Sequence, residues 1–131
     1  MTQTEIKQKW REKGRCTKCG SASRPPEPGK EMCFKCAQHE LLRLRRYRWK
    51  IRQEVILHYG NKCTCCGETN IKFLTIDHID GGGNQHKKEI KLTGSEFLRY
   101  LKKVGYPTGF QVLCWNCNCA RIQFGVCPHK V

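Results

Sequence analysis

Eleven cysteines in 131 residues constrain the fold of this chain more than any other feature of its sequence. Eight of them form four Cys-x-x-Cys pairs, which are Cys16/Cys19, Cys33/Cys36, Cys63/Cys66 and Cys114/Cys117. A Cys-x-x-Cys turn directs two sulfurs at one point, and a second pair completes the tetrahedral shell that Zn²⁺ prefers. The sequence therefore predicts two structural zinc sites, one from the first two pairs and one from the last two.

A disulfide framework or scattered free thiols is the alternative. The odd number of cysteines, the recurring spacing and the absence of a signal peptide favour zinc in a reducing compartment, so we expect a cytoplasmic protein. Cys65, Cys119 and Cys127 belong to no pair. The segment Cys127-Pro128-His129 could add a metal ligand, but we expect a packed thiol and a surface histidine there.

The first two pairs predict a zinc-ribbon module in residues 1–38. Cys19 and Cys33 are separated by 13 residues rich in Ser, Pro, Gly and charge, which is zinc-ribbon spacing. So short a segment cannot bury enough apolar area to fold unaided, and the metal would supply most of its stability. Basic residues around the cysteines favour a ribbon that contacts DNA, while a structural cap or a protein-docking knuckle is the alternative.

A basic linker helix is predicted for residues 39–59. The segment from Ala37 to Tyr59 contains no Gly or Pro, and Gly60 follows it as a helix stop. A mostly apolar stripe recurs at three- and four-residue intervals, at Leu41, Leu44, Ile51 and Val55. One helix with one partly apolar face is therefore expected.

Positive charge covers the rest of this helix. Its basic residues are Arg43, Arg45, Arg46, Arg48, Lys50 and Arg52. With Tyr47 and Trp49 among them, this charge density favours binding to a DNA backbone over a face that is only solvated or a helix that is only a spacer. The formal net charge of +14 and the lack of any segment apolar enough to span a membrane agree with a nucleic-acid partner.

The last two pairs enclose 47 residues, which is more than a zinc ribbon needs. This segment contains Asp77 and His78, and the final pair runs directly into Asn118. Hydrolysis of a phosphodiester needs a deprotonated water, which an imidazole can provide. It also needs charge neutralisation, which Mg²⁺ held by carboxylate or amide oxygens can provide. Residues 60–131 therefore combine a candidate base with two candidate metal ligands.

Three segments, residues 62–67, 74–79 and 112–118, together resemble the HNH endonuclease family of the ββα-metal superfamily. The resemblance covers roughly residues 60–131 and implies a small α+β, zinc-bound ββα-metal nuclease domain. It implies that His78 is the general base, and that Asp77 and Asn118 hold a catalytic Mg²⁺ or Mn²⁺. It also implies a metal-dependent endonuclease that nicks or cleaves DNA, of the compact phage or mobile-element type that includes homing endonucleases. A phage-encoded protein would act in the host cytoplasm.

The resemblance departs at one position. Many family members carry an Asn nine residues before the position of Asn118, where it braces the hairpin, but this chain has Gly109 there. We expect a backbone hydrogen bond, Asn84 or Asn116 to replace that brace.

Two further groups are candidates for contact with the substrate. Gly81, Gly82 and Gly83 permit close approach of the backbone to a phosphate, although a flexible hairpin loop is the alternative. The residues that follow offer an auxiliary catalytic histidine and phosphate contacts, and they are His86, Lys87 and Lys88. Arg121 should share a helix face with Asn118, where its guanidinium would bind a DNA phosphate.

Within residues 60–131 we expect a β-hairpin near residues 72–79 and 110–114, followed by a helix from about Asn116. Residues 95–104 predict an inserted amphipathic helix with Phe97 and Leu101 inward. The leading hypothesis is a DNA endonuclease, with homodimerisation as a route to double-strand cleavage. The alternatives are a non-catalytic zinc-dependent DNA-binding or regulatory protein and an RNA-cleaving enzyme.

Overall fold

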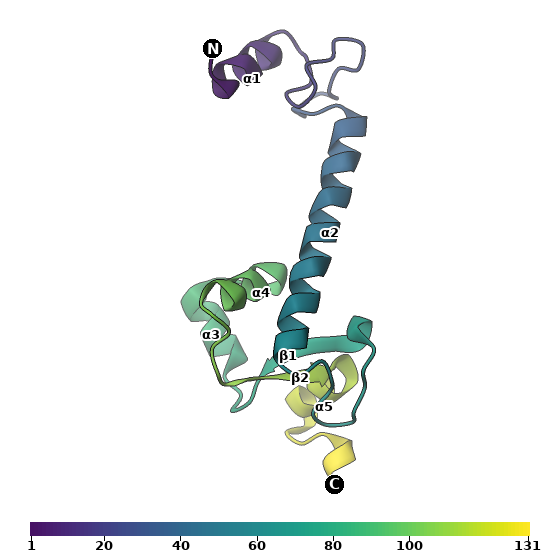
Figure 1. Ribbon diagram of the computed structural model, residues 1–131, viewed down its shortest axis with the longest axis vertical. Coiled ribbons are helices and arrows are strands. Elements are labelled where there is room, and N and C mark those ends of the chain that lie inside the picture. The colour runs from purple at the N-terminus through teal and green to yellow at the C-terminus, as the bar shows by residue number, and fades with distance from the viewer. The chain divides into compact units, whose positions relative to one another are not determined.

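The computed structural model describes residues 1–131 except for the side chains of Asn84 and Lys87. It contains five α-helices: α1 (Gln3–Glu12), α2 (Phe34–His58), α3 (Gly83–Ile90), α4 (Gly94–Lys103) and α5 (Trp115–Phe124). Two strands, β1 (Leu74–His78) and β2 (Phe110–Cys114), form one sheet, and short 3₁₀ turns are η1 (Ile71–Phe73) and η2 (Pro128–Lys130) (Figure 1). The predicted mixed α+β class is therefore confirmed.

Two compact units divide the chain, Met1–Tyr47 and Arg48–Val131. Helix α2 contributes its first half to one unit and its second half to the other. The boundary between the units falls within the predicted linker, residues 39–59. The second half of the helix packs into the core of the second unit.

The first unit has almost no apolar core. Its buried residues are Cys16, Thr17 and Cys33. Helix α1, which was not predicted, begins with a capping box in which the Thr2 and Glu5 side chains each bind the other's backbone N–H. The cysteines are thus the centre of this unit.

Helix α2 begins at Phe34, three residues before the predicted start, and ends at His58. The apolar stripe is buried only in its second half. Ile51 and Val55 are buried, whereas Leu41 is 39% exposed. In the second unit Ile51 and Val55 pack against Phe97 and Leu101 of α4.

Helix α4 confirms the predicted inserted helix to within one residue at each end. Phe97 and Leu101 are buried, as the amphipathic pattern predicted. The Glu54 carboxylate of α2 accepts a hydrogen bond from Lys102, which adds an ion pair at the rim of this apolar contact. The periodicity of a helix therefore identified its packed face correctly.

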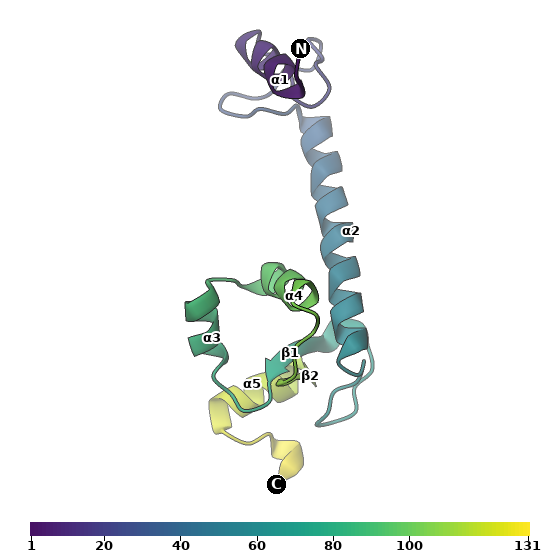
Figure 2. The same cartoon turned by 60° about the vertical axis from the view of Figure 1, so that its left-hand side comes forward.

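Strands β1 and β2 are antiparallel, with Leu74 opposite Cys114 and His78 opposite Phe110. Helices α3 and α4 lie between the two strands in the chain, and α5 follows β2 without a loop, so the order is β1, α3, α4, β2, α5. The predicted hairpin and following helix are confirmed. Helices α3 and α4 lie on one side of the hairpin and α5 lies on the other (Figure 2).

The main core of the second unit lies between α2, the hairpin and the start of α5. Its buried residues are Ile56, Cys63, Leu74, Val112, Leu113, Cys114, Cys117 and Cys127. Half of these are cysteines, so three of the four predicted zinc ligands of the second unit are also core residues. Within the described residues, no helix is long and apolar enough to cross a membrane.

Candidate functional site

The first two Cys-x-x-Cys pairs meet in the first unit, as predicted. The Sγ atoms of Cys16, Cys19, Cys33 and Cys36 all lie within 4.8 Å of one another. Cys19 Sγ and Cys33 Sγ are 4.0 Å apart, close to the roughly 3.8 Å between sulfurs in a tetrahedral site with Zn–S bonds of about 2.3 Å. This group is therefore compatible with a zinc ion.

Local backbone geometry assembles this group. Gly20 adopts φ +68°, and its N–H donates to the carbonyl of Cys16 at 2.8 Å. A side chain at Gly20 would collide with Trp10, whose ring carbons lie 2.7 Å from the position of a Cβ. Burial opposes ionisation of Cys16, but backbone amides, foremost that of Cys33, outweigh it and lower the pKa of Cys16 to about 6. At Cys16 the site thus favours the thiolate, which is the form that binds zinc, whereas burial and hydrogen bonds with the neighbouring thiols raise the pKa of Cys36 to about 12.

The last two pairs meet in the second unit. The Sγ atoms of Cys63, Cys66, Cys114 and Cys117 lie within 4.8 Å of one another. Cys66 Sγ and Cys114 Sγ are 3.7 Å apart. Cys114 caps α5, and its sulfur accepts the backbone N–H of Cys117 at 3.4 Å. The expected tetrathiolate group is present and compatible with zinc.

A third group of candidate ligands involves the C-terminal segment, where a packed thiol and a surface histidine were expected. The ligand atoms of Cys65, Cys117, Cys127 and His129 also lie within 4.8 Å of one another. His129 Nδ1 is 3.4 Å from both Cys117 Sγ and Cys127 Sγ. Cys127 is buried and His129 is exposed, as expected, but their donor atoms also belong to a group that could hold a metal ion. Their Cys-x-His spacing was the available sequence signal, but their partners lie far away in the chain.

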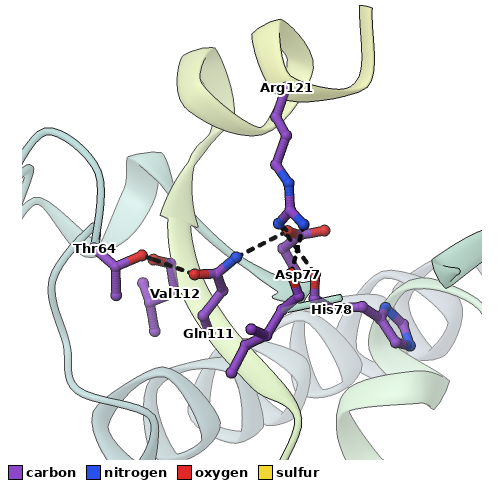
Figure 3. A network of polar contacts seen from close by, with 7 residues as sticks. Thr64, Asp77, His78, Gln111, Val112 and Arg121 are labelled. Carbon is purple, nitrogen blue, oxygen red and sulfur yellow. Dashed lines mark hydrogen bonds and ion pairs between the residues drawn. The ribbon is translucent and has the colours of Figure 1, made fainter. Parts of the chain in front are cut away.

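Asp77 lies at the centre of a polar network at the end of β1 (Figure 3). Its Oδ2 accepts hydrogen bonds from Arg121 of α5 and from Gln111 Nε2 at 3.3 Å. Gln111 is the register partner of Asp77 on β2, which sequence analysis did not identify. The carboxylate thus faces α5 and is held by two donors.

Arg121 connects α5 to the end of β1. Besides Asp77, it donates to the carbonyl of His78 at 3.1 Å and to that of Ile79 at 2.5 Å. This guanidinium is therefore engaged within the protein in this structure. The predicted phosphate contact of Arg121 stays a prediction.

His78 points to the other side of the hairpin from Asp77. Neighbouring side chains of a strand face opposite sides, and Figure 3 shows the imidazole of His78 extending away from the Asp77–Arg121 network. Its Nε2 lies 2.8 Å from Nδ1 of His86, on α3. The structure thus pairs the two histidines that the sequence proposed separately, and it separates His78 from the carboxylate.

Aromatic rings surround this histidine pair. The His78 ring lies 4.7 Å from Phe110 and 6.0 Å from Phe97, measured between centroids. The His86 ring makes an edge contact with Phe97 at 5.7 Å. Both imidazoles are half-buried. The contacts with Phe97 and Phe110 restrict rotation of the two imidazoles at the edge of the hairpin.

The three glycines form a tight turn into a helix, which was not expected. Gly81 and Gly82 adopt φ +76° and +78°, and α3 begins at Gly83. A Cβ at Gly83 would lie 3.0 Å from Nδ1 of His78. This glycine is therefore needed for the close approach of α3 to His78. The predicted approach to a phosphate stays a prediction.

Asn118 lies in the second turn of α5, three residues before Arg121. Its side-chain Oδ1 is buried and has no hydrogen-bond partner among the described residues. An unsatisfied buried acceptor is costly, and a cation is one partner that would satisfy it. Asn118 therefore remains suited to the role of metal ligand.

Gly109 stands where the resemblance to the HNH family would place an Asn. Gly109 adopts φ +96°, a conformation that disfavours any side chain, and its carbonyl accepts the N–H of Ile79 at 3.0 Å. This bond ties the two ends of the hairpin together. A backbone hydrogen bond was one of the expected replacements for the Asn, and its bracing role in a nuclease site stays a prediction. Asn116 is exposed, and the side chain of Asn84 lies outside the described residues.

The basic residues of α2 fall into two classes. Arg52 is half-buried, donates to the carbonyl of Leu74 and lies 5.6 Å above the Trp115 ring. Burial lowers its pKa. The others are exposed, and they are Arg43, Arg45, Arg46, Arg48 and Lys50. The expectation that all six cations are available to DNA is thus corrected for Arg52, which packs within the second unit. Lys88 is exposed, and the side chain of Lys87 lies outside the described residues.

Comparison of the sequence with protein-family models gave no match, and comparisons with curated proteins and with solved structures gave no significant match either.

Proposed function

We propose that this chain is a metal-dependent endonuclease that hydrolyses DNA phosphodiester bonds, with His78 as the general base. The proposal rests on the resemblance of residues 60–131 to the HNH family and on the antiparallel pair of β1 and β2, which leads directly into α5. The observation that carries it is the buried, unpartnered oxygen of Asn118, because the same helix reaches the Asp77 carboxylate through Arg121.

Asp77 and Asn118 would hold the catalytic ion. Carboxylate and amide oxygens are the hard donors that Mg²⁺ and Mn²⁺ prefer. The donor set fits, since one oxygen is anionic and the other lacks a hydrogen-bond partner among the side chains that the structure describes. Such an ion neutralises charge on the phosphate and on the leaving oxygen.

His78 would take the proton from the attacking water. His86, 2.8 Å from Nε2 of His78, orients the imidazole and can accept or pass on the proton. Phe97 and Phe110 limit access of bulk water to this side of the ring. Arg121 would hold Asp77 in place before the ion binds, and its second role at a DNA phosphate remains part of the proposal.

DNA would also contact the exposed cations of α2. Arg43, Arg45, Arg46, Arg48 and Lys50 supply a positive surface, and phosphate binding by such residues releases counterions. Replacing Arg45 and Arg46 by Ala should weaken binding of a DNA duplex and reduce the salt dependence of its affinity. Lys72→Ala/Lys103→Ala, which removes the same charge elsewhere on the surface, is the matched control.

Relaxation of supercoiled plasmid in Mg²⁺ or Mn²⁺ tests the activity. Wild-type protein should produce open circles or linear DNA, and EDTA should prevent this. His78→Ala and Asn118→Ala should each lose cleavage, while His39→Ala and Asn116→Ala, which change exposed residues of the same types, should retain it. Loss of cleavage in the control variants, or cleavage by His78→Ala, would contradict the assignment. Parallel assays with RNA would separate an RNA-cleaving enzyme.

A second candidate is a non-catalytic DNA-binding protein with the same fold. It is favoured by one observation, that Asp77 is engaged by Arg121 while His78 points to the other side of the hairpin. Zinc-loaded protein that binds DNA but leaves it intact across metals and sequences would establish this candidate instead.

A further inference from the structure

Cys117 belongs to two groups of candidate ligands at once. One group is the predicted tetrathiolate set of Cys63, Cys66, Cys114 and Cys117, and the other is formed by Cys65, Cys117, Cys127 and His129. Each group contains four donors, which is the number that a structural zinc ion requires. We propose that the second unit binds two zinc ions, and that the Cys117 thiolate bridges them.

The donor distances support the second ion. Tetrahedral zinc with Zn–S bonds of about 2.3 Å and Zn–N bonds of about 2.0 Å places a sulfur and a nitrogen about 3.6 Å apart. His129 Nδ1 lies 3.4 Å from Cys117 Sγ and 3.4 Å from Cys127 Sγ. These separations are those of ligands around a common ion.

The chain brings these donors together from three places. Cys65 lies between Cys63 and Cys66 in the sequence, and Cys117 lies in the first turn of α5. Gly125 ends α5 with φ +78°, after which Cys127 and His129 return toward the start of the helix. Cys65, Cys117 and Cys127 line one cavity of about 270 Å³. The three cysteines of the group therefore border an open space that could admit an ion.

Burial and charge favour a bridged pair over isolated thiols. Cys117 is 1% exposed and Cys127 is 7% exposed, so both sulfurs are shielded from water. One Zn²⁺ bound by four thiolates carries a net charge of −2. A second Zn²⁺ that shares Cys117 and adds Cys65, Cys127 and neutral His129 adds two positive and two negative charges. The second ion therefore adds four bonds to the core without adding net charge.

The second ion would fix the C-terminal segment onto the candidate site. It would join Cys127 and His129 to the residue that directly precedes Asn118. The orientation of the first turns of α5 would then depend on both ions. This inference does not require the proposed nuclease activity.

Metal content of the 131-residue chain tests the stoichiometry. Elemental analysis of wild-type protein, purified with zinc and passed through a desalting column, should give one zinc ion for each of the three groups. Cys127→Ser/His129→Ala should lose one ion. Cys119→Ser, which changes an exposed cysteine outside all three groups, should lose none. Two ions in the wild type, or an unchanged count in the double variant, would overturn the second site.

Exchange of zinc for ¹¹³Cd tests the bridge without any variant. Two of the three cadmium resonances of the wild-type chain should show scalar coupling to each other, because a shared thiolate transmits it. The third resonance, from the first unit, should show none. Three uncoupled resonances would overturn the bridging role of Cys117.

Discussion

Arg121 of α5 donates a hydrogen bond to the carboxylate of Asp77, the residue next to the end of β1. The same guanidinium binds the carbonyls of His78 and Ile79, so one side chain joins the helix to the end of the strand. Both side chains are mostly shielded, with 30% exposure for Arg121 and 18% for Asp77. This link positions the two halves of the candidate site.

Replacing Arg121 by Ala should lower the free energy of unfolding by about 1–2 kcal/mol, because a half-buried carboxylate loses a charged donor. The free energy of unfolding of Arg121→Lys should lie between that of Arg121→Ala and that of the wild type, since an ammonium cannot reach all three acceptors in the same geometry. Urea denaturation of zinc-loaded protein measures this difference. Arg99→Ala, at an exposed position on α4, is the control, and an equal effect there would contradict the prediction.

Gly83→Ala should displace the His78 ring. The new methyl group would lie 3.0 Å from Nδ1 of His78, tighter than ordinary contact, while alanine itself is favourable in a helix. The imidazole resonances of His78 should therefore shift in NMR spectra, and plasmid cleavage should fall, with little loss of stability. Gln85→Ala, at an exposed position on the same helix, should leave those resonances in place.

Leu74→Ala should destabilise the second unit by about 2–5 kcal/mol, because this side chain of β1 is fully buried in the core of the unit. Leu57 of α2 is 67% exposed, and Leu57→Ala should cost far less. Denaturation of both variants under zinc-saturated conditions gives the comparison. Similar losses for the two would mean that Leu74 is not part of a packed core.

Removal of zinc should unfold the first unit. Its described buried residues are two cysteines and one threonine, so little apolar area opposes the conformational entropy of the chain. Addition of a strong chelator should collapse the dispersion of amide NMR signals from residues 1–33, and zinc should restore it. Cys16→Ser should produce the same loss without chelator. Persistent dispersion in the metal-free protein would contradict the prediction.

Acidification should remove the contribution of the Glu54–Lys102 ion pair to the stability of the fold. Its hydrogen bond with Lys102 holds the pKa of the Glu54 carboxyl below the ordinary value of 4.5. A lowered pKa means that the ion pair stabilises the fold above that ordinary value, and that this contribution is lost as the pH falls through the pKa of the folded state. Glu54→Gln should therefore be slightly less stable than wild type at neutral pH and equal to it in acid. A difference that grows in acid would contradict this assignment.

Local patterns predicted much of the structure. The pairing of the Cys-x-x-Cys motifs followed from the short reach of each turn and the four-ligand demand of zinc. Helix α4 followed from the periodicity of Phe97 and Leu101, and the hairpin was expected from the resemblance of residues 60–131 to a ββα-metal domain. The first two predictions depend on residues that are near one another in the sequence or on a strong ligand rule.

Other features could not be predicted because they depend on which face each side chain takes. The register that places His78 opposite Phe110 also turns it toward His86 and away from Asp77. Arg52 lies on the packed side of α2, although the other five basic residues predicted to bind DNA are exposed. A charged residue in a basic run carries no local signal for burial.

The sequence by itself determined which cysteines form the two tetrathiolate groups, where the amphipathic helix lies and which residues are chemically able to act as base and metal ligands. These properties are set by spacing, periodicity and side-chain chemistry. Only the tertiary structure decided that Arg121 binds Asp77, that His78 meets His86, and that Cys127 and His129 join Cys65 around Cys117. Those contacts arise when the strands pair and the chain turns back at Gly125, which brings together residues that no local pattern connects.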